Sequence, residues 1–239
     1  MDAASVAAHL QEAKDHWYFV GRLAVLRTVV DAVRPRGRLR ILELGCGSGN
    51  VLEEFAGLGE AVGMEPHPDM IAAARAAGLD VRQGDLPGDL VVPDGWADMV
   101  LMLDVVEHVD DDAGALRTAR RALRPGGVLV VTVPAYAWLW SGHDVAVGHR
   151  RRYVASALRA LVAQAGFRVE HVSYFNTLLF PGAVLMRAWK RLRGDTSHDM
   201  HRPPALINRL FAAAFGFERF LVPRWRLPFG VSILLVGRR

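Results

Sequence analysis

The residues whose types and spacing point most directly to chemistry form a glycine-rich segment, E-L-G-C-G-S-G-N at 43–50. The segment follows the short apolar run 40–42 and precedes 51–55, which is typical of the first turns of a helix. Glycines at alternate positions let the backbone turn sharply and let a ligand touch bare main chain. The start of the helix adds N–H groups that have no partner within the helix. The pattern predicts a site for a nucleotide-type ligand at a strand-to-helix turn.

Three acidic residues follow later apolar segments, each where a strand is expected to end. Glu65 closes the segment 61–65, at the distance from the first glycine where a carboxylate can accept hydrogen bonds from ribose hydroxyls. Asp85 follows a third short strand, and Asp104 ends the nearly continuous apolar segment 97–104. Ligands bind at the carboxyl edge of open α/β sheets. We therefore expect these acids to face one site.

Together, these segments resemble the class I S-adenosylmethionine-dependent methyltransferases, in the type 11/23 branch that acts on small molecules. The resemblance covers about residues 38–175 and rests on the glycine-rich segment, Glu65, G-D-L at 84–86, D-V-V-E-H-V at 104–109 and L-R-P-G-G at 123–127. It implies that the cofactor is S-adenosyl-L-methionine. It also implies an α/β fold, with a Rossmann-like seven-stranded sheet flanked by helices and an antiparallel last strand.

The resemblance assigns a role to each part of the cofactor site. The glycine turn would lie against the methionine and ribose, Glu65 would hold both ribose hydroxyls, Asp85 would bind the adenine amino group, and Asp104 would lie near the sulfonium. Cys46 is expected to be a packing residue, since no base stands beside it in the sequence. The residues expected to bind the cofactor are Glu43, Gly45, Cys46, Gly47, Gly49, Asn50, Glu65, Pro66, Asp85, Leu86 and Asp104.

Two alternatives stay open on the sequence alone. An NAD-dependent dehydrogenase would carry G-x-G-x-x-G, whereas this chain reads G-x-G-x-G followed by Asn50. Asp85 and the loop E-H-V at 107–109 favour methyl transfer over that alternative. The other is a catalytically inactive regulatory protein that binds S-adenosylmethionine, because an intact cofactor site does not by itself show transferase activity.

The segment 134–144 is the predicted acceptor site, because it leaves the ligand-facing edge of the sheet and carries three aromatic residues. Within it, His143 beside Asp144 could act as a catalytic base, since histidine titrates near neutral pH. The alternative is that His143 only hydrogen-bonds a loop carbonyl. Many methyl transfers need no strong base, so a catalytic residue is not obligatory.

A basic run, His149-Arg150-Arg151-Arg152-Tyr153, comes next. Its arginines could clamp a phosphate or carboxylate on the acceptor. The alternative is that they form salt bridges with acids such as 110–112. We assign no metal ligands. The residues expected to bind the acceptor are His108, Tyr136, Trp140, His149, Arg150, Arg152 and Tyr153.

The segment after the fourth expected strand also bears on the acceptor. Related enzymes that methylate planar amino groups typically carry Asn/Asp-Pro-Pro-Tyr there, whereas 104–107 reads D-V-V-E. The sequence thus argues against the amino groups of nucleobases or glutamine as methyl acceptors. We expect a small-molecule acceptor that is apolar or anionic, methylated on oxygen, carbon or nitrogen.

The whole chain has 239 residues, about half of them apolar, which suits one large domain. The single cysteine fits a reducing compartment. The sequence shows no signal-peptide pattern and no apolar run of the ~18 residues that would span a bilayer. We expect a cytoplasmic protein. It carries no nucleic-acid recognition motif, and its oligomeric state stays open.

The expected elements divide the chain into three parts. Residues 1–36 would form an N-terminal helical cap, 37–176 and 230–239 the core, and 177–229 a helical insertion between the last two strands. The strands are expected at 39–44, 61–65, 80–84, 97–104, 127–133, 167–175 and 231–237, and helices at 5–33, 156–165, 178–192 and 206–221.

The insertion is unusual in size and charge. About 55 residues separate the last two strands, and 177–229 carries nine lysines and arginines against three acids. Large apolar residues precede the basic ones in its first helix, a pattern typical of a membrane-surface element. We expect the insertion to cap the acceptor pocket, to favour an apolar or lipid-linked acceptor and to contact a membrane peripherally. The alternative is that both helices pack on the sheet or on a second subunit.

Overall fold

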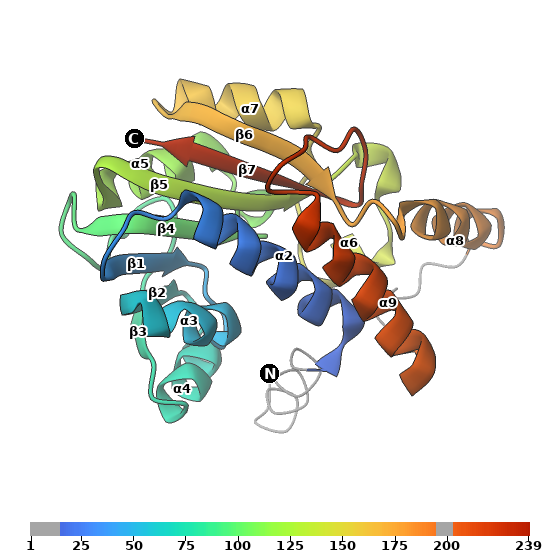
Figure 1. Cartoon of the computed structure of the whole chain (residues 1–239), viewed down its shortest axis with the longest axis horizontal. Coiled ribbons are helices and arrows are strands. Elements are labelled where there is room, and N and C mark those ends of the chain that lie inside the picture. Colours follow the sequence, from blue (N-terminus) through green and yellow to red (C-terminus); the bar gives the residue numbers. More distant parts are fainter. Residues whose placement is uncertain (1–14, 195–202) are drawn as a thin grey trace.

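A seven-stranded sheet forms the centre of the protein, with strands in the order β3-β2-β1-β4-β5-β7-β6 (Figure 1). The computed structural model describes residues 15–194 and 203–239. Strand β7 runs antiparallel to β5 and β6, whereas the pairs among β1 to β5 are parallel. The predicted fold class is therefore confirmed. The strands are β1 (Leu39–Leu44), β2 (Gly59–Glu65), β3 (Asp80–Gln83), β4 (Ala97–Leu103), β5 (Leu123–Pro134), β6 (Arg168–Phe175) and β7 (Ser232–Arg238).

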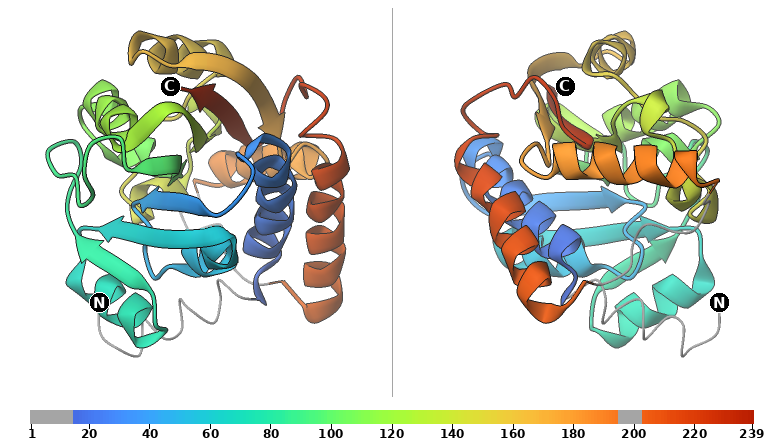
Figure 2. Two further views of the ribbon diagram at one scale, coloured as in Figure 1. Left: turned by 60° about the vertical axis from the view of Figure 1, so that its left-hand side comes forward. Right: turned by 90° about the vertical axis from the view of Figure 1, so that its right-hand side faces the viewer.

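Helices cover both faces of the sheet (Figures 1 and 2). On one face, α2 and α9 place Val25 and Phe215 in a core cluster. On the other face, α5 and α7 place Leu116 and Leu158 in a second cluster. The helices are α2 (Trp17–Val33), α3 (Asn50–Phe55), α4 (Pro68–Ala76), α5 (Asp112–Ala122), α6 (Gly142–Ala146), α7 (Ala155–Gln164), α8 (Phe180–Leu192) and α9 (Ala205–Phe217).

The central strands read as almost continuous apolar runs because both of their faces are covered. Successive side chains of a strand point to opposite faces. In β4, Val100 and Met102 join the cluster under α5 and α7, whereas Met99 and Leu101 join the cluster under α2 and α9. The sheet is thus packed on both sides, and its carboxyl edge is left to bind ligands.

Strand β5 differs from the prediction at its start. It begins at Leu123, so L-R-P-G-G lies inside the strand and not before it. Its pairing with β4 jumps from Ala97–Leu123 to Met99–Val128, which shows that extra residues bulge out of the ladder. A proline and two glycines suit such a bulge, because they interrupt regular pairing.

The two helices predicted in the insertion are present, with shifted ends. The predicted helix 178–192 corresponds to α8, which begins at Phe180. The predicted helix 206–221 corresponds to α9 and the 3-10 turn Glu218–Phe220 that follows it. The first part of the predicted helix 5–33 lies outside the described residues, and α2 begins at Trp17.

Helix α9 packs along α2 (Figure 2). The side chain of Asn208 joins them by accepting a hydrogen bond from the Trp17 N–H (3.0 Å) and donating one to the Asp15 carbonyl (2.8 Å). Phe215 is fully buried between α2 and the sheet. It leaves no room for a side chain at Gly21, where a Cβ atom would lie 2.6 Å from its ring. Helix α9 is therefore part of the core and not a detached arm.

Replacing Phe215 by alanine should lower the free energy of unfolding by about 3–5 kcal/mol, because the change leaves a cavity between helix and sheet. The matched control is Phe217→Ala on the same helix, where the side chain is exposed and the loss should stay within about 0.5 kcal/mol. Urea denaturation of both variants measures the difference. Equal stabilities would contradict the packing of α9 described above.

Candidate active site

The glycine-rich turn between β1 and α3 has the geometry of a ligand-binding loop. The N–H groups of Gly45 and Cys46 donate to the Met64 carbonyl (2.8 and 3.1 Å), which ties the turn to β2. Gly47 and Gly49 have positive φ angles of +55° and +82°. A Cβ atom on Gly47 would meet nothing within 4 Å. The turn therefore offers bare main chain facing open space.

Glu65 supports this turn from the end of β2. Its buried carboxylate accepts hydrogen bonds from the N–H groups of Gly47 (2.9 Å) and His67 (3.1 Å). It also lines a cavity of about 620 Å³ at the carboxyl edge of the sheet. The predicted cofactor residues that line this cavity, called here the smaller cavity, are Gly45, Gly47, Glu65, Pro66, Asp85, Leu86 and Asp104.

The remaining predicted cofactor residues divide into two groups. Glu43, Cys46 and Asn50 line a neighbouring, larger cavity. Gly49 is a packing glycine, since a Cβ atom there would lie 2.4 Å from Leu79. Burial raises the pKa of Glu43 to about 8. Burial also raises the pKa of the Cys46 thiol, which agrees with a packing role for that residue.

The larger cavity has a volume of about 1180 Å³ and a mostly apolar lining. It meets the smaller cavity at residues that line both: Gly45, Gly47, Asp104, His108 and Val147. Side chains from α2, α8 and α9 form much of its wall. Its apolar lining includes Trp17, Phe19, Met70, Leu103, Pro134, Leu178, Leu179, Ala183, Met186 and Phe211.

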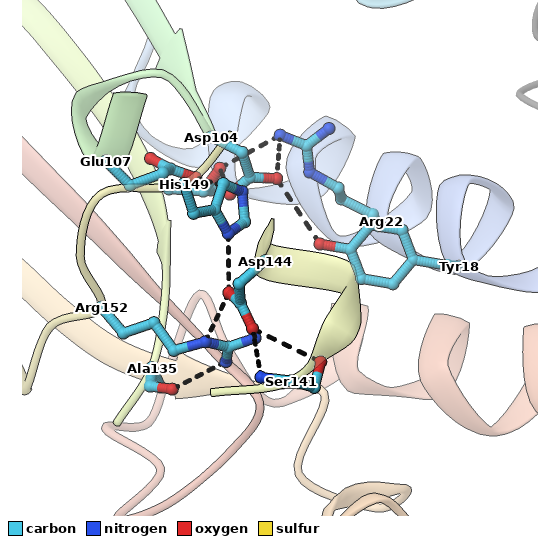
Figure 3. A network of polar contacts seen from close by, with 10 residues as sticks. Tyr18, Arg22, Asp104, Glu107, Ala135, Ser141, Asp144, His149 and Arg152 are labelled. Atoms are coloured by element: carbon cyan, nitrogen blue, oxygen red, sulfur yellow. Dashed lines mark hydrogen bonds and ion pairs between the residues drawn. The ribbon is translucent and has the colours of Figure 1, made fainter. Parts of the chain in front are cut away.

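Asp104 stands where the two cavities meet, and three side chains from two elements hold its carboxylate (Figure 3). Arg22 of α2 contacts Oδ2 at 2.8 Å, and Thr132 of β5 donates to Oδ1 at 3.0 Å. The Tyr18 hydroxyl lies 3.5 Å from Oδ2. Arg22 also donates to the Thr132 hydroxyl (3.1 Å). The carboxylate of Asp104 is thus fixed in position at the junction.

A second polar network, centred on Asp144, lies beside the larger cavity (Figure 3). His149 Nδ1 is 2.7 Å from Asp144 Oδ1, and Arg152 donates to both carboxylate oxygens at 2.7 and 2.9 Å. Burial alone would raise the pKa of Asp144, but these hydrogen bonds hold that pKa well below its usual value. In the tautomer whose Nδ1–H is accepted by Asp144, the lone pair of the ring lies on Nε2, which is 3.7 Å from Glu107 Oε1.

Comparison with known proteins distinguishes between a methyltransferase and a dehydrogenase, the two enzyme classes considered for this site. A family model described as a methyltransferase domain matches residues 16–172, about two thirds of the chain. The chain belongs to this methyltransferase family. A Mycolicibacterium smegmatis protein named "Probable S-adenosylmethionine-dependent methyltransferase" is 35% identical over 215 residues, which cover 87% of this chain and 78% of that protein. The protein is an enzyme with S-adenosyl-L-methionine as its cofactor, and the dehydrogenase alternative is set aside.

Two further similarities are more limited. A ubiquinone biosynthesis O-methyltransferase of Azorhizobium caulinodans is 39% identical over 108 residues, which are 42% of each chain. This match therefore spans less than half of that relative's length. A solved S-adenosylmethionine-dependent methyltransferase structure from Archaeoglobus fulgidus has a TM-score of 0.64 and 19% identity, covering 97% of this chain and 99% of that one. At that identity, the likeness shows the fold alone.

The sequence paired Asp144 with His143, but in the methyltransferase Asp144 holds His149. Adjacent residues in a helix point about 100° apart, and both predicted partners lie on α6. The chain then turns at Gly148, which has a φ of +76°, and brings His149 back against Asp144. His143 lines the larger cavity, whereas Asp144 is fully buried behind it.

The basic run also differs from an acceptor clamp. Arg150 pairs with Asp110, and Arg151 pairs with Asp112 at 2.9 Å. Arg152 is buried against Asp144. Each guanidinium group is therefore engaged by an acid, as the salt-bridge alternative predicted. Arg150 and Arg152 still border the smaller and larger cavities, respectively.

Three aromatic residues predicted to bind the acceptor have other contacts. Tyr136 stacks on Tyr174, with 5.1 Å between ring centroids. The Tyr153 hydroxyl lies within hydrogen-bond distance of Asp112 (2.9 Å), and the Trp140 carbonyl accepts a hydrogen bond from Arg191 (3.1 Å). Tyr136, Trp140 and Tyr153 are absent from the linings of the two described cavities. The sequence placed them near the site because they follow β5, but Tyr136 and Tyr153 direct their side chains to Tyr174 and Asp112.

Glu107, His108 and His149 are the set of described side chains that could hold a metal ion, with ligand atoms within 4.8 Å of one another. Glu107 is fully buried, and neither of its carboxylate oxygens has a hydrogen-bond partner. Burial and the neighbouring Asp104 raise the pKa of Glu107 well above its usual value. The side chain of Glu107 therefore favours its neutral, protonated form. The assignment of no metal ligand stays a prediction.

Sequence reasoning missed the residues of α2 that reach the site. Tyr18 and Arg22 both contact Asp104 from one face of the helix. A signal was present, since Arg22 occupies a core position on the same face as Val25, Val29 and the aromatic patch at 16–19. A charged residue at a core position needs a buried partner, because an unpaired buried charge is costly. The identity of that partner required the structure.

Replacing Gly47 by alanine should weaken the binding of S-adenosylhomocysteine to the methyltransferase about tenfold or more, because the new methyl group enters the open space beside the turn. A positive φ also strains any L-residue by roughly 1–2 kcal/mol. Gly37→Ala is the matched control, since Gly37 has a φ of +92° and an equally open surrounding. Titration calorimetry on both variants separates strain from lost binding. Equal affinities in the two variants would contradict the loop assignment.

Replacing Glu65 by alanine should weaken cofactor binding by about 1–3 kcal/mol, because the charged hydrogen bonds to the ribose hydroxyls that the resemblance assigns to Glu65 would be lost. The same change removes the acceptor for the Gly47 N–H. Glu60→Ala is the control, because Glu60 is exposed on the same strand. If Glu65→Ala binds S-adenosylhomocysteine as the wild type does, Glu65 has no place in the ribose site.

Proposed function

We propose that this methyltransferase methylates a hydroxyl group of a largely apolar small-molecule or lipid-like acceptor. The observation that carries the proposal is the large apolar cavity, which opens onto the cofactor side of the sheet at Asp104 and His108. Apolar walls with few polar groups are typical of sites that bind apolar molecules. Arg150 and Arg152, which border the two cavities, are already paired with Asp110 and Asp144, so they are not free to clamp an anionic acceptor. Arg187 and Lys190 also line the larger cavity, within its mostly apolar wall.

The cofactor residues have proposed roles that their positions support. S-adenosyl-L-methionine supplies, when bound, a methyl group on a sulfonium that an oxygen lone pair can attack. Glu65 would hold the ribose hydroxyls, the main chain at Gly47 would lie against the cofactor, and Asp85 would bind the adenine amino group. Asp104 would face the sulfonium from the junction of the cavities. The division of the chain into a cap (1–36), a core and an insertion (177–229) in one domain likewise stays our proposal.

The proton of the acceptor hydroxyl would pass to Nε2 of His149. The methyl group would come from the bound cofactor, whose sulfur would keep the electron pair of the broken bond, so the acceptor oxygen would have to lose its proton. The freed proton then needs a base in the cavity, and His149 lines the cavity with Nδ1 held by Asp144 at 2.7 Å. Asp144 is a positioning residue here, because it is buried away from the cavity. The names of the ubiquinone biosynthesis O-methyltransferases support oxygen as the atom methylated.

The location proposed for the enzyme follows from the acceptor. Among the residues that the structure describes, no helix combines the length and apolar character needed to cross a bilayer. We propose that the enzyme works in the cytoplasm and meets its acceptor at a membrane surface. A lipid-like acceptor is concentrated there, and the cavity could receive it without full exposure to water.

Replacing His149 by glutamine should lower kcat about a hundredfold or more with the affinity for S-adenosylhomocysteine intact, because only proton removal is lost. The comparison variant is His143→Gln, in the same cavity, for which we expect a smaller loss. A larger loss of kcat in His143→Gln than in His149→Gln would indicate that His143, and not His149, is the base.

The acceptor class is tested by supplying radiolabelled S-adenosylmethionine and a bacterial extract separated into organic and aqueous fractions. We expect label in the organic fraction, as a methyl ether in mass spectra. Label confined to water-soluble products or macromolecules would overturn the proposed acceptor class.

A further inference from the structure

Helix α8 contributes no buried residue to the protein, although most of its residues are apolar. Leu185, Trp189 and Leu192 are spaced at i, i+4 and i+7, so they share one face of the helix. They are exposed by 71%, 56% and 85%. An amphipathic helix normally turns such a stripe inward, toward a core. This stripe, called here the outer face of α8, points away from the core.

Helix α9 repeats the arrangement. Its inner face is buried on α2 through Asn208 and Phe215. Its opposite side carries Leu206, Leu210 and Phe217, exposed by 70%, 59% and 53% and spaced at i, i+4 and i+11. We call this stripe the outer face of α9. Both helices lie on the side of the molecule that faces the viewer in the right panel of Figure 2.

The polar residues around these outer faces carry one sign of charge. The described residues of 177–229 include eight lysines and arginines, and one acid, Glu218. Glu218 is buried and accepts hydrogen bonds from the N–H groups of Thr177 and Leu178 (2.6 and 2.8 Å). The charge presented to solvent here is therefore positive. Arg193 lies 4.1 Å from the Trp189 ring centroid, so cation and apolar stripe are adjacent.

We propose that the outer faces of α8 and α9 form a docking surface for an anionic phospholipid bilayer. Exposed apolar stripes of this kind mark interaction sites. Apolar side chains that enter the headgroup region, bordered by cations that meet lipid phosphates, are the features that hold an amphipathic helix at a bilayer surface. A bilayer presents both the apolar and the anionic component that this surface matches.

A second copy of the chain fits the surface less well. In a two-fold symmetric dimer the same patch meets itself, so the arginines around the outer faces would approach one another. Like charges across an interface are unfavourable. The charge pattern thus favours an anionic bilayer over self-association.

The docking surface adjoins the larger cavity. Ala183 and Met186 of α8 line that cavity, as does Leu179 directly before the helix. Leu185, Trp189 and Leu192 lie on the outer face of α8. Arg191 donates to the Trp138 and Trp140 carbonyls and fastens the helix to the turn after β5. One helix therefore forms both the cavity wall and the proposed contact with lipid. This last link rests on the proposed function, but docking itself does not.

The test is flotation of the full chain with vesicles, without cofactor or acceptor. We expect association with phosphatidylglycerol-containing vesicles at low salt, weaker association as salt rises, and little with pure phosphatidylcholine. The double variants Leu185→Ser/Leu192→Ser and Leu206→Ser/Leu210→Ser should each weaken partitioning about tenfold or more. Arg193→Gln/Arg209→Gln should weaken it about fivefold for each charge removed.

The matched controls are Val154→Ser and Arg159→Gln. Both residues are exposed; Val154 directly precedes α7 and Arg159 lies on it. Both should float like the wild type, and thermal melting confirms that all variants fold. No association with anionic vesicles at low salt would overturn the proposal, as would equal losses in variants and controls. So would a dimer in sedimentation experiments that the leucine variants dissociate. Vesicle binding by an enzyme that methylates only water-soluble acceptors would overturn the proposed acceptor class and leave docking intact.

Discussion

The ion pair between Arg22 and Asp104 is the contact on which the geometry of the site depends. The guanidinium group is almost fully buried, so it needs an anionic partner to offset its lost hydration. Asp104 supplies the charge from the end of β4, and Thr132 adds a neutral acceptor from β5. The pair thereby fixes α2 across the sheet. Because α2 also carries the packing surface for Phe215, the position of α9 follows from the same contact.

Asp144 plays a corresponding part on the other side of the larger cavity. It holds Arg152 and His149 together, and the neighbouring Arg150 and Arg151 bind Asp110 and Asp112 after β4. The loops after β4 and β5 are therefore joined by charged contacts, with His149 and His108 between them, their rings 4.8 Å apart. The run of arginines at 150–152 therefore stabilises the loops around the site. The lining of the larger cavity is mostly apolar, and its charged residues include Arg22 and Asp104 at the junction and Arg187 and Lys190 on α8.

Helix α8 shows how one element can serve two surroundings. Its inner residues complete the wall of a cavity that the sheet alone would leave open, and its outer residues face away from the protein. Among residues 15–194 and 203–239, no second layer covers that outer face, and α9 packs on α2 instead. The proposed cofactor site is thus built on the sheet, and much of the wall of the larger cavity is built on helices.

The sequence by itself determined the features that depend on local rules. The glycine turn, the acids at the ends of β2 and β4, and the apolar strands follow from backbone sterics and periodicity, so the fold and the cofactor edge could be predicted. Only the tertiary structure decided which charges meet. Asp144 binds His149 and not its neighbour His143, and Arg22 reaches Asp104 across 82 positions. Such pairings depend on where loops and helices lie in space, and no spacing along the chain encodes that directly.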